Sequence, residues 1–155
     1  MAEVYPEAIA CIEKITPDAA GVRVITIVNS DAEESAVNTA IDYHDAFNEG
    51  DVTKTNMFLN FPHARVGADG KLVIAEKPGD MLPADFFTRF RTEYGWNHTC
   101  CDSRTVIQSN ESKVHLMVTF SRYRKDGSRI GTFPSLWVIT KQDGHWGIKM
   151  RSSHA

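Results

Sequence analysis

The last third of the chain carries two Asp-Gly pairs, each placed between runs of residues typical of β-strands. Asp126-Gly127 separates residues 114–124 from 131–141, and Asp143-Gly144 separates the latter run from residues 145–152. Asp-Gly between such runs is a strong hairpin signal, because a type I′ turn needs positive φ at both central residues. The C-terminal half is therefore predicted to be an antiparallel meander.

Two amphipathic helices are expected ahead of the meander, at residues 31–49 and 83–94, with a short helix between them at 51–58. Ser30 or Asp31 would cap the first helix, and Gly50 would end it. Pro83 would open the later helix and Gly95 would end it. Helices that cover one face of a curled antiparallel sheet give an α+β fold with room for an apolar pocket.

The apolar stripe of the first helix consists of residues spaced three and four apart: Val37, Ala40, Ile41, His44 and Phe47. His44 is interpreted as a core histidine because it belongs to this stripe. The chain has 155 residues, 42% of them hydrophobic, which suits one domain with one core. That domain is expected to span residues 31–155. Residues 1–30 are expected to form an N-terminal extension, with a possible short helix at 6–15 and an edge strand at 22–28.

Composition excludes several classes of protein. A formal charge of −3 and the lack of a Lys/Arg run argue against nucleic-acid binding. No apolar run of about 18 residues and no leader pattern is found, so the protein is expected to be cytoplasmic and without a membrane segment. The three cysteines form no CxxC pattern and are expected to be reduced. Histidine spacing offers no metal motif, and neither a metal nor a cofactor is expected.

Loop positions predict which residues pair across the hairpins. With Asp126-Gly127 and Asp143-Gly144 as two-residue loops, the expected pairs are Phe120 with Phe133, Val118 with Ser135, Leu116 with Trp137, Ile139 with Ile148, and Trp137 with Met150. One face of the meander is thus almost wholly apolar. Met117, Leu136 and Val138 alternate onto the other face, which predicts a homodimer that covers them.

Arg122 continues the alternation of Leu116, Val118 and Phe120, so its guanidinium should point to the apolar face. An unpaired guanidinium is costly there unless it meets an anion. No acidic residue shares this face of the meander. The sequence therefore predicts a ligand with a carboxylate, or one that develops an enolate, bound by Arg122 together with Arg65.

A first hairpin is expected around Asp69-Gly70, and its register pairs His63 with Glu76. A carboxylate beside an imidazole can fix the tautomer and orient a general base. The alternative is an exposed His-Glu pair at the end of a hairpin. Asp102 and Arg104, two apart on one strand, are interpreted as a structural ion pair, with a functional relay as the alternative.

This order of elements, with the closing segment WVITKQDGHWGI at residues 137–148, resembles the nuclear-transport-factor-2-like (NTF2-like) superfamily and its SnoaL-like and ketosteroid-isomerase-like branch. The resemblance covers residues 31–154. It implies a cone-shaped barrel, a strongly bent antiparallel sheet wrapped on about three helices, often dimeric, whose hollow holds a hydrophobic ligand. Members of the branch include isomerases, dehydratases, epoxide hydrolases, polyketide cyclases and proteins with no known activity, so the fold alone does not give the reaction.

Tyr43, seven residues before Gly50, matches the oxyanion-hole tyrosine of the ketosteroid isomerases. The segments where those enzymes place their acidic residues, here 61–67 and 134–138, contain no carboxylate. The chain also resembles uncharacterised SnoaL-like proteins with the motifs FPHAR, GW-x-H, D-x-R, RYR-x-DG and RSS. This resemblance implies roles for His63, Arg65, Trp96, His98, Arg122 and Arg151.

The sequence as a whole favours a cofactor-independent enzyme that performs proton transfer, as an isomerase or lyase does, on an apolar, oxygenated or carboxylated substrate. His63 would be the acid or base, oriented by Glu76, and Tyr43 would hold an oxygen. The expected substrate-binding residues are Arg65, Arg122, Trp96, His98, Phe120, Trp137, Ser135 and Arg151. The alternative is a non-catalytic ligand-binding or dimeric interaction protein of the same fold.

Overall fold

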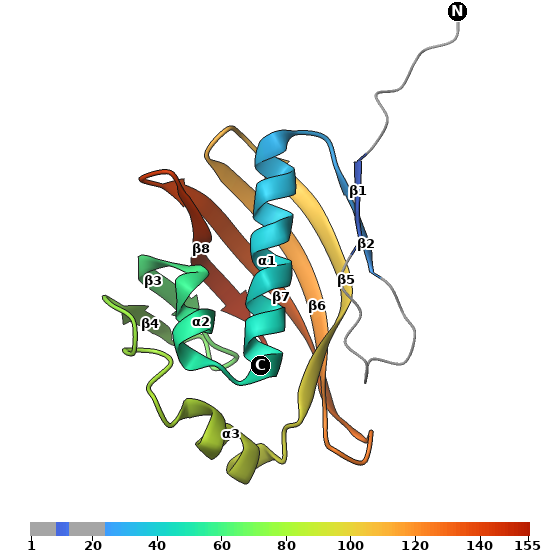
Figure 1. The fold of residues 1–155 in the computed structure, drawn as a ribbon, viewed down its shortest axis with the longest axis vertical. Helices are drawn as coiled ribbons and strands as arrows, with labels where there is room; N and C mark the ends of the chain where they lie inside the picture. The colour runs from blue at the N-terminus through green and yellow to red at the C-terminus, as the bar shows by residue number, and fades with distance from the viewer. Residues whose placement is uncertain (1–8, 13–23) are drawn as a thin grey trace, which may run out of the picture.

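A six-stranded sheet forms the body of the protein in the computed structural model, which describes residues 9–12 and 24–155. Its strands are β3 (Leu59–Val66), β4 (Leu72–Ala75), β5 (His98–Ser109), β6 (Lys113–Tyr123), β7 (Arg129–Gln142) and β8 (His145–Ser153). They lie in the order β4-β3-β8-β7-β6-β5, and every neighbouring pair is antiparallel except β3 with β8, which is parallel. The predicted α+β fold is confirmed, with one parallel pair in an otherwise antiparallel sheet (Figure 1).

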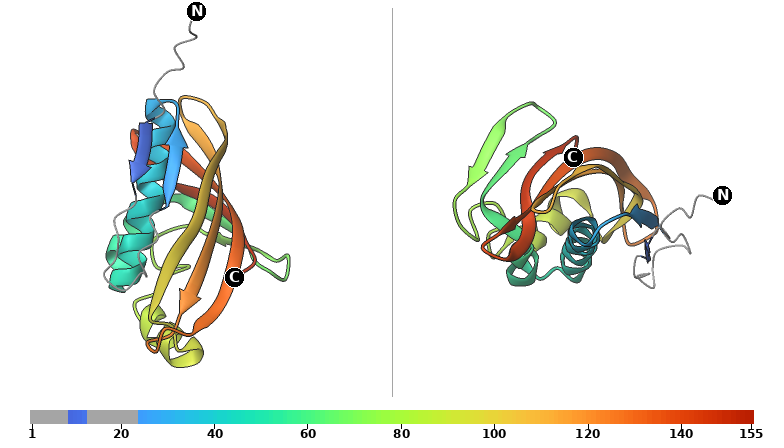
Figure 2. Two further views of the ribbon diagram at one scale, coloured as in Figure 1. Left: turned by 90° about the vertical axis from the view of Figure 1, so that its right-hand side faces the viewer. Right: turned by 90° about the horizontal axis from the view of Figure 1, so that it is seen from above.

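Three helices accompany this sheet. The long helix α1 (Asp31–Glu49) lies across the concave face, α2 (Val52–Met57) follows it, and α3 (Phe86–Tyr94) lies at one end. The curl of the sheet around α1 is visible from above (Figure 2). All five residues of the predicted α1 stripe are buried, so this helix fills the hollow of the sheet along most of its length.

Both ends of α1 are closed by local hydrogen bonds. The Ser30 hydroxyl accepts from the backbone N–H of Glu33 at 3.2 Å, while the Glu33 carboxylate accepts from the backbone N–H of Asn29 at 2.7 Å. The first bond satisfies an N–H group that the first turn of a helix leaves without a partner, and the second joins the residue before the N-cap to the same turn. Gly50 ends the helix with a φ of 70°, a left-handed conformation that glycine adopts at little cost.

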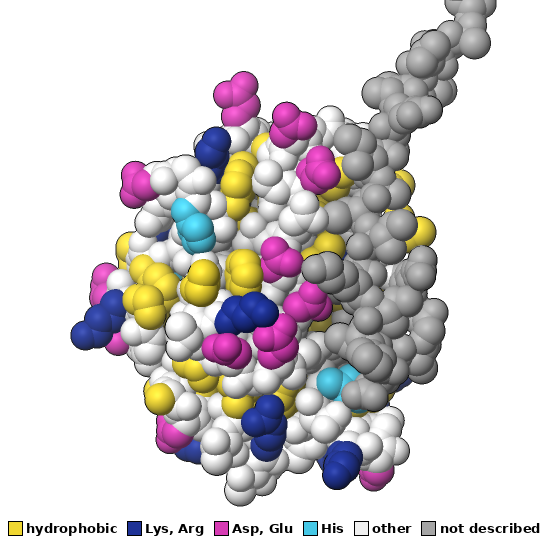
Figure 3. Space-filling model, in the orientation of Figure 1, with side chains coloured by type: hydrophobic (Ala, Val, Ile, Leu, Met, Phe, Trp, Pro, Cys, Tyr) yellow, Lys and Arg dark blue, Asp and Glu magenta, His cyan; other side chains and the backbone are white. Residues whose placement is uncertain are grey.

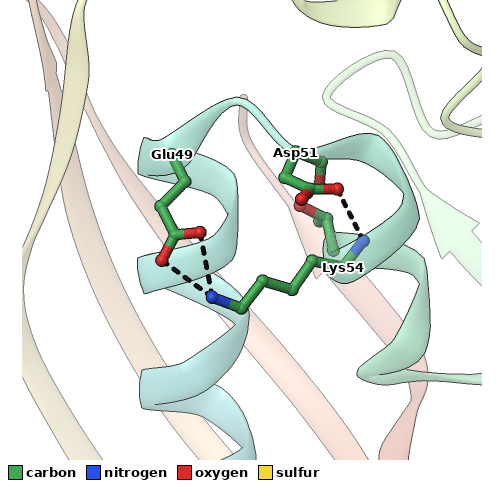
Figure 4. A network of polar contacts seen from close by, with 4 residues as sticks. Glu49, Asp51 and Lys54 are labelled. Carbon is green, nitrogen blue, oxygen red and sulfur yellow. Dashed lines mark hydrogen bonds and ion pairs between the residues drawn. The ribbon is translucent and has the colours of Figure 1, made fainter.

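A small polar network joins α2 to α1 (Figure 4). Asp51 caps α2 by accepting from the backbone N–H of Lys54 at 2.9 Å. The ammonium group of the same lysine bonds both carboxylate oxygens of Glu49 at 2.9 Å. These side chains are exposed, so the contacts orient α2 while contributing little to stability.

The helix α3 begins later than predicted. Pro83 lies before it, and the backbone N–H of Phe86 bonds the Pro83 carbonyl at 2.9 Å. Residues 84–85 therefore form a turn that leads into the helix, with Asp85 as its N-cap. The predicted end at Gly95 is confirmed, with a φ of 67°.

Only one of the three Asp-Gly turns has the expected backbone. Asp143 and Gly144 both have positive φ, 51° and 78°. At the other two pairs only the glycine does, and the turns close over five residues, 67–71 and 124–128. Relative to the predicted two-residue loop, each of these loops shifts the pairing of its two strands by one residue.

In the meander, an irregularity between Arg122 and Tyr123 compensates for that change. Phe120 pairs with Phe133, Val118 with Ser135 and Leu116 with Trp137, as predicted. In the first hairpin nothing compensates. His63 pairs with Ala75, so the predicted pairing with Glu76 is wrong, and Glu76 lies exposed beyond the end of β4.

A β-bulge interrupts the pairing of β7 with β8. Ile139 pairs with Ile148 as predicted, but Val138 pairs with Met150, which leaves Lys149 as the extra residue. Beyond the bulge Trp137 pairs with Arg151, so the predicted pair of Trp137 with Met150 is wrong. A bulge of this kind exchanges the residues that face the two sides of the sheet.

Strand β5 also departs from simple alternation. Its pairing with β6 shifts between Cys101 and Ser103, so Asp102 is the extra residue. Asp102 is exposed and accepts a hydrogen bond from the Ser121 hydroxyl at 2.6 Å, whereas Arg104 is buried. The two side chains do not share a face, and their interpretation as an ion pair along one strand face is wrong.

The described part of the N-terminal region is a separate ribbon. Strands β1 (Ile9–Ile12) and β2 (Ile25–Val28) pair antiparallel in their own two-stranded sheet. The helix predicted for residues 6–15 is wrong at 9–12, and the rest of that prediction lies outside the described residues. The strand predicted at 22–28 is found at 25–28, but it does not join the main sheet as an edge strand.

On the face drawn in Figure 3, basic side chains of the described residues lie among acidic ones, over elements that include α1 and α2. Within the described ranges, no helix is long and apolar enough to cross a membrane.

Candidate functional site

A cavity of about 580 Å³ opens between the concave face of the sheet, the C-terminal half of α1 and the helix α3. Most of the residues predicted to form the site line it: Tyr43, Arg65, Phe120, Arg122, Ser135, Trp137 and Arg151. Phe47, Met81, Phe86, Phe90 and Phe133 complete much of the wall. The cavity is therefore apolar over much of its surface, with several guanidinium groups.

Arg122 lies in a cage of aromatic rings. Its Cζ atom is 4.9 Å, 5.3 Å and 5.0 Å from the ring centres of Phe90, Phe120 and Phe133. Its Nε atom is buried without a hydrogen-bond partner, and the described residues supply no carboxylate to it. Ring faces attract a cation, but they do not replace the acceptors that each N–H loses when it leaves water.

Burial lowers the pKa of Arg122 to about 10, and the positive charges of Arg65 and Arg151 act in the same direction. The group still carries its charge at neutral pH. Gly131, the strand partner of Arg122, makes room for the cage. A Cβ atom at this glycine would lie 2.7 Å from the Phe133 ring, so any larger residue would displace one wall.

Arg151 is held in a different way, by three hydrogen bonds from its guanidinium. Nε donates to His63 Nε2 at 3.4 Å, one terminal nitrogen donates to the Tyr43 hydroxyl, and the other donates to Met81 Sδ at 3.5 Å. The Cζ atom also lies 5.0 Å from the centre of the Tyr43 ring. No partner in this set is a carboxylate, so a second positive charge faces the cavity without an anion from the described residues.

His63 fixes the position of Arg151. Its Nδ1 atom lies 2.7 Å from the Ile148 carbonyl, which can only accept, so Nδ1 carries the proton and Nε2 is free to accept from Arg151. Burial and, to a smaller extent, the positive charge of Arg151 lower the pKa of His63 to about 4. The imidazole is fully buried, neutral at pH 7 and bonded at both nitrogens, and it does not line the cavity.

The position of His63 follows from an interruption in the pairing of β3 with β8. Leu59 pairs with Ile148 and Ala64 pairs with Met150, so residues 60–63 are not paired with β8, although His63 still pairs with Ala75 of β4. Two polar side chains of this segment bond backbone carbonyls of β7 and β8. Asn60 donates to the Thr140 carbonyl at 2.8 Å, and His63 donates to the Ile148 carbonyl.

Tyr43 reaches the same cavity from α1. Its ring is 2% exposed and packs edge-on against Trp137, with ring centres 5.5 Å apart. Its hydroxyl oxygen accepts from Arg151, which leaves the hydroxyl proton available to a ligand oxygen. The residue can therefore act as a hydrogen-bond donor beside a positive charge.

Ser135 is already occupied by the protein. It accepts from the Trp137 indole N–H at 2.8 Å and donates to the Ser152 carbonyl at 2.9 Å. It thus satisfies a buried indole, and its proton is not available to a ligand.

Three further predicted site residues lie away from the cavity. Glu76 is exposed, and its backbone N–H bonds the Asp80 carboxylate. Trp96 is a core residue whose indole N–H bonds the Thr99 hydroxyl at 2.9 Å. His98 stacks on the Tyr123 ring, with centres 5.2 Å apart. None of the three lines the cavity that Arg122 and Arg151 face.

Several residues that line the cavity were not predicted from the sequence to be site residues. Phe86 and Phe90 were recognisable only as the apolar face of a helix, and Phe133 only as the partner of Phe120. Met81 lies in a loop and carries no pattern that would have identified it. The main-chain oxygen of Ala155 accepts from Arg65 at 2.8 Å, a contact with no local signal in the sequence.

Comparisons with known proteins agree on the fold. A family model described as NTF2-like protein (DUF6841) matches residues 31–155. A protein of unknown function with a cystatin-like fold from Nostoc punctiforme has a TM-score of 0.64 at 15% identity, over 81% of this chain and 92% of that one. A ketosteroid isomerase-like protein from Erwinia carotovora atroseptica has a TM-score of 0.62 at 15% identity, over 81% and 97%. A search of curated proteins found no match.

The two buried histidines predict that acid destabilises the fold. Burial lowers the pKa of His44 to about 3 and that of His63 to about 4, whereas both titrate near 6.5 when the chain is unfolded. Between the two sets of values the unfolded chain binds more protons, so the free energy of unfolding should fall as the pH falls through this window. The expected loss is roughly 2 to 3 kcal/mol per histidine at about pH 4.5.

Urea denaturation near pH 7.5 and near pH 4.5 measures this loss. The variant His63→Gln, whose amide can still donate to Ile148 and accept from Arg151, should lose a smaller part of its stability on acidification. His154→Gln changes an exposed histidine and should behave as the parent protein does. Equal acid sensitivity in all three proteins would contradict the assignment of a neutral, buried His63.

Proposed function

This chain belongs to the NTF2-like family DUF6841, and we propose that its cavity binds a small organic anion, whose negative charge meets the guanidinium groups that line the cavity, Arg122 first among them, and whose apolar body lies against the surrounding rings. The observation that carries the proposal is the state of Arg122. This guanidinium is largely buried among three phenylalanine rings, and no described residue offers it a hydrogen-bond acceptor.

The electrostatic argument concerns the cost of such a charge. An ion taken out of water loses several kcal/mol of solvation, and a nearby opposite charge offsets this loss. The ion pairs between described residues, Lys54 with Glu49, Lys71 with Asp69 and Arg89 with Asp85, leave Arg122 and Arg151 unmatched. A carboxylate that enters the cavity would supply the missing acceptors.

The size of the cavity also supports a small ligand. Its volume of about 580 Å³ falls within the range of roughly 300 to 1,000 Å³ common for small-molecule sites. The phenylalanine rings and Trp137 suit an apolar body. The overall charge of −3 provides no basic field for a polyanion, so we place the ligand in the cavity.

A second candidate is proton-transfer catalysis on the bound anion, as in an isomerase or lyase. Tyr43 supports it, because its hydroxyl can donate to a ligand oxygen while Arg151 bonds the same hydroxyl and stabilises negative charge. The base would have to be other than His63. That imidazole uses its Nε2 lone pair for Arg151 and does not line the cavity, so we assign His63 to positioning Arg151.

Loss of Arg122 should reduce affinity for an organic acid without unfolding the protein. The probe is the carboxylic acid that raises the melting temperature most in a thermal-shift screen. Arg122→Met should weaken its binding by about 10- to 100-fold, the effect of a hydrogen bond to a charged group. Isothermal titration calorimetry measures the affinity.

Arg124→Gln is the matched control, because Arg124 is two residues away and exposed. It should bind as the parent protein does. Arg122→Met should also be at least as stable as the parent without ligand, since it removes a buried charge that no described carboxylate matches. Equal affinity in the two variants would place Arg122 outside the binding site.

Catalysis is tested by exchange of carbon-bound protons. In D₂O, NMR should detect exchange next to the carbonyl of a bound keto acid, and Tyr43→Phe should slow it by at least tenfold, since one hydrogen-bond donor to the developing anion is lost. Tyr123→Phe, on the last residue of β6, should leave the rate unchanged. If the parent protein produces no exchange above that of buffer, the protein is a binder rather than an enzyme of this kind.

The homodimer stays a proposal. On the outer face of the sheet Met117 is 53% exposed and Leu136 is half-buried, while Val138 is 9% exposed and contributes little. A second copy that covers this face would bury Met117. Met117→Glu should therefore shift sedimentation from a dimer to a 17.3 kDa species, whereas Met57→Glu, at an equally exposed methionine on α2, should not. A 17.3 kDa parent species at micromolar concentration would contradict the dimer.

A further inference from the structure

The charges that line the cavity do not balance. Among the charged side chains of the described lining are the arginines Arg65, Arg89, Arg122 and Arg151 and one side-chain carboxylate, that of Glu93, which is exposed on α3. Arg89 pairs with Asp85 at 3.2 Å, and Arg65 donates to the main chain at Ala155. Two guanidinium groups, those of Arg122 and Arg151, are left for a ligand.

Each of these two arginines has free donors of its own. A guanidinium has five N–H groups. Arg151 uses three of them, for His63, Tyr43 and Met81, so two remain. Arg122 has aromatic rings around it instead of acceptors, and it therefore retains its donors. Both groups can bind a carboxylate through more than one N–H, which is the strong form of this interaction.

The two groups also come from different parts of the sheet. Arg122 on β6 pairs with Gly131, and Arg151 on β8 pairs with Trp137, so their strand positions along β7 are six residues apart. At about 3.3 Å per residue this separates their backbones by roughly 20 Å along the strand. Their side chains reach into one cavity from these separate positions, and the Arg122 guanidinium lies among three phenylalanine rings while that of Arg151 lies over the Tyr43 ring. The two groups therefore occupy different parts of the cavity wall, and each can take a carboxylate of its own.

We propose that the ligand carries two carboxylates on a flat, apolar body, with one carboxylate at Arg122 and the other at Arg151. This proposal rests on the proposed function and narrows it from organic anions to diacids. The body lies among aromatic side chains that include Phe86, Phe90 and Phe133, which favour a planar ring. The apolar walls increase the preference for a diacid over a monoacid, because a site whose charged donors are left without acceptors rejects a ligand that lacks the matching group.

Matched pairs of acids test the number of carboxylates. Benzoate is compared with phthalate, isophthalate and terephthalate, and hexanoate with adipate, by calorimetry at neutral pH and fixed ionic strength. At least one diacid should bind tenfold or more tightly than its monoacid. Arg122→Gln and Arg151→Gln should each reduce the affinity of that diacid to about the level of the monoacid, while Arg124→Gln leaves it unchanged.

Arg151→Lys is the control for a loss of folding, because it keeps the positive charge and removes the paired N–H donors of the guanidinium group. It should keep the circular dichroism of the parent protein and still prefer the diacid, by a smaller factor. If the monoacid binds as tightly as every diacid of its series, the diacid inference is wrong and the proposed function stands. If none of the acids binds, both are wrong.

Discussion

One extra residue in β8 decides which side chains of the last strand face the cavity. Lys149 forms the bulge, and beyond it Arg151 instead of Met150 pairs with Trp137. Without the bulge a methionine would meet the indole, and the guanidinium would be on the outer side of the sheet. The bonds from Arg151 to Tyr43, His63 and Met81 all depend on this change of face.

The pairing of β3 with β8 is interrupted at the same position of β8 as the bulge. Residues 60–63 are not paired with β8 at the position of Lys149, and the side chains of Asn60 and His63 bond the backbone carbonyls of Thr140 on β7 and Ile148 on β8. A buried carbonyl that loses its partner costs about as much as a lost hydrogen bond, so these polar side chains are required where the two irregularities meet. His63 thereby obtains one fixed tautomer, and that tautomer can accept from Arg151.

The cavity combines apolar walls with positive charge, and this combination is unfavourable for an empty protein. Arg122 keeps its charge although burial lowers its pKa to about 10. Replacement of such a group by an apolar residue is often neutral or stabilising. Its presence is therefore better explained by what it binds than by what it contributes to the fold. A ligand with negative charge would supply what the described residues do not.

The sequence by itself determined the fold, the long capped helix and the apolar face of the meander, because these depend on local periodicity, turn residues and pairing between neighbouring strands. It also placed Arg122 correctly on the cavity side, since β6 alternates regularly from Leu116 to Arg122. The strand pairs predicted from the sequence were wrong for His63 with Glu76 and for Trp137 with Met150. One additional residue in a turn or a bulge changes the register of the two strands, and no local pattern marks that residue. Only the tertiary structure decided that His63 binds the main chain of β8 and that Arg151 faces inward. The first follows from the parallel pairing of β3 with β8, strands that the sequence separates by about eighty residues, and the second follows from the bulge at Lys149 in the pairing of β7 with β8.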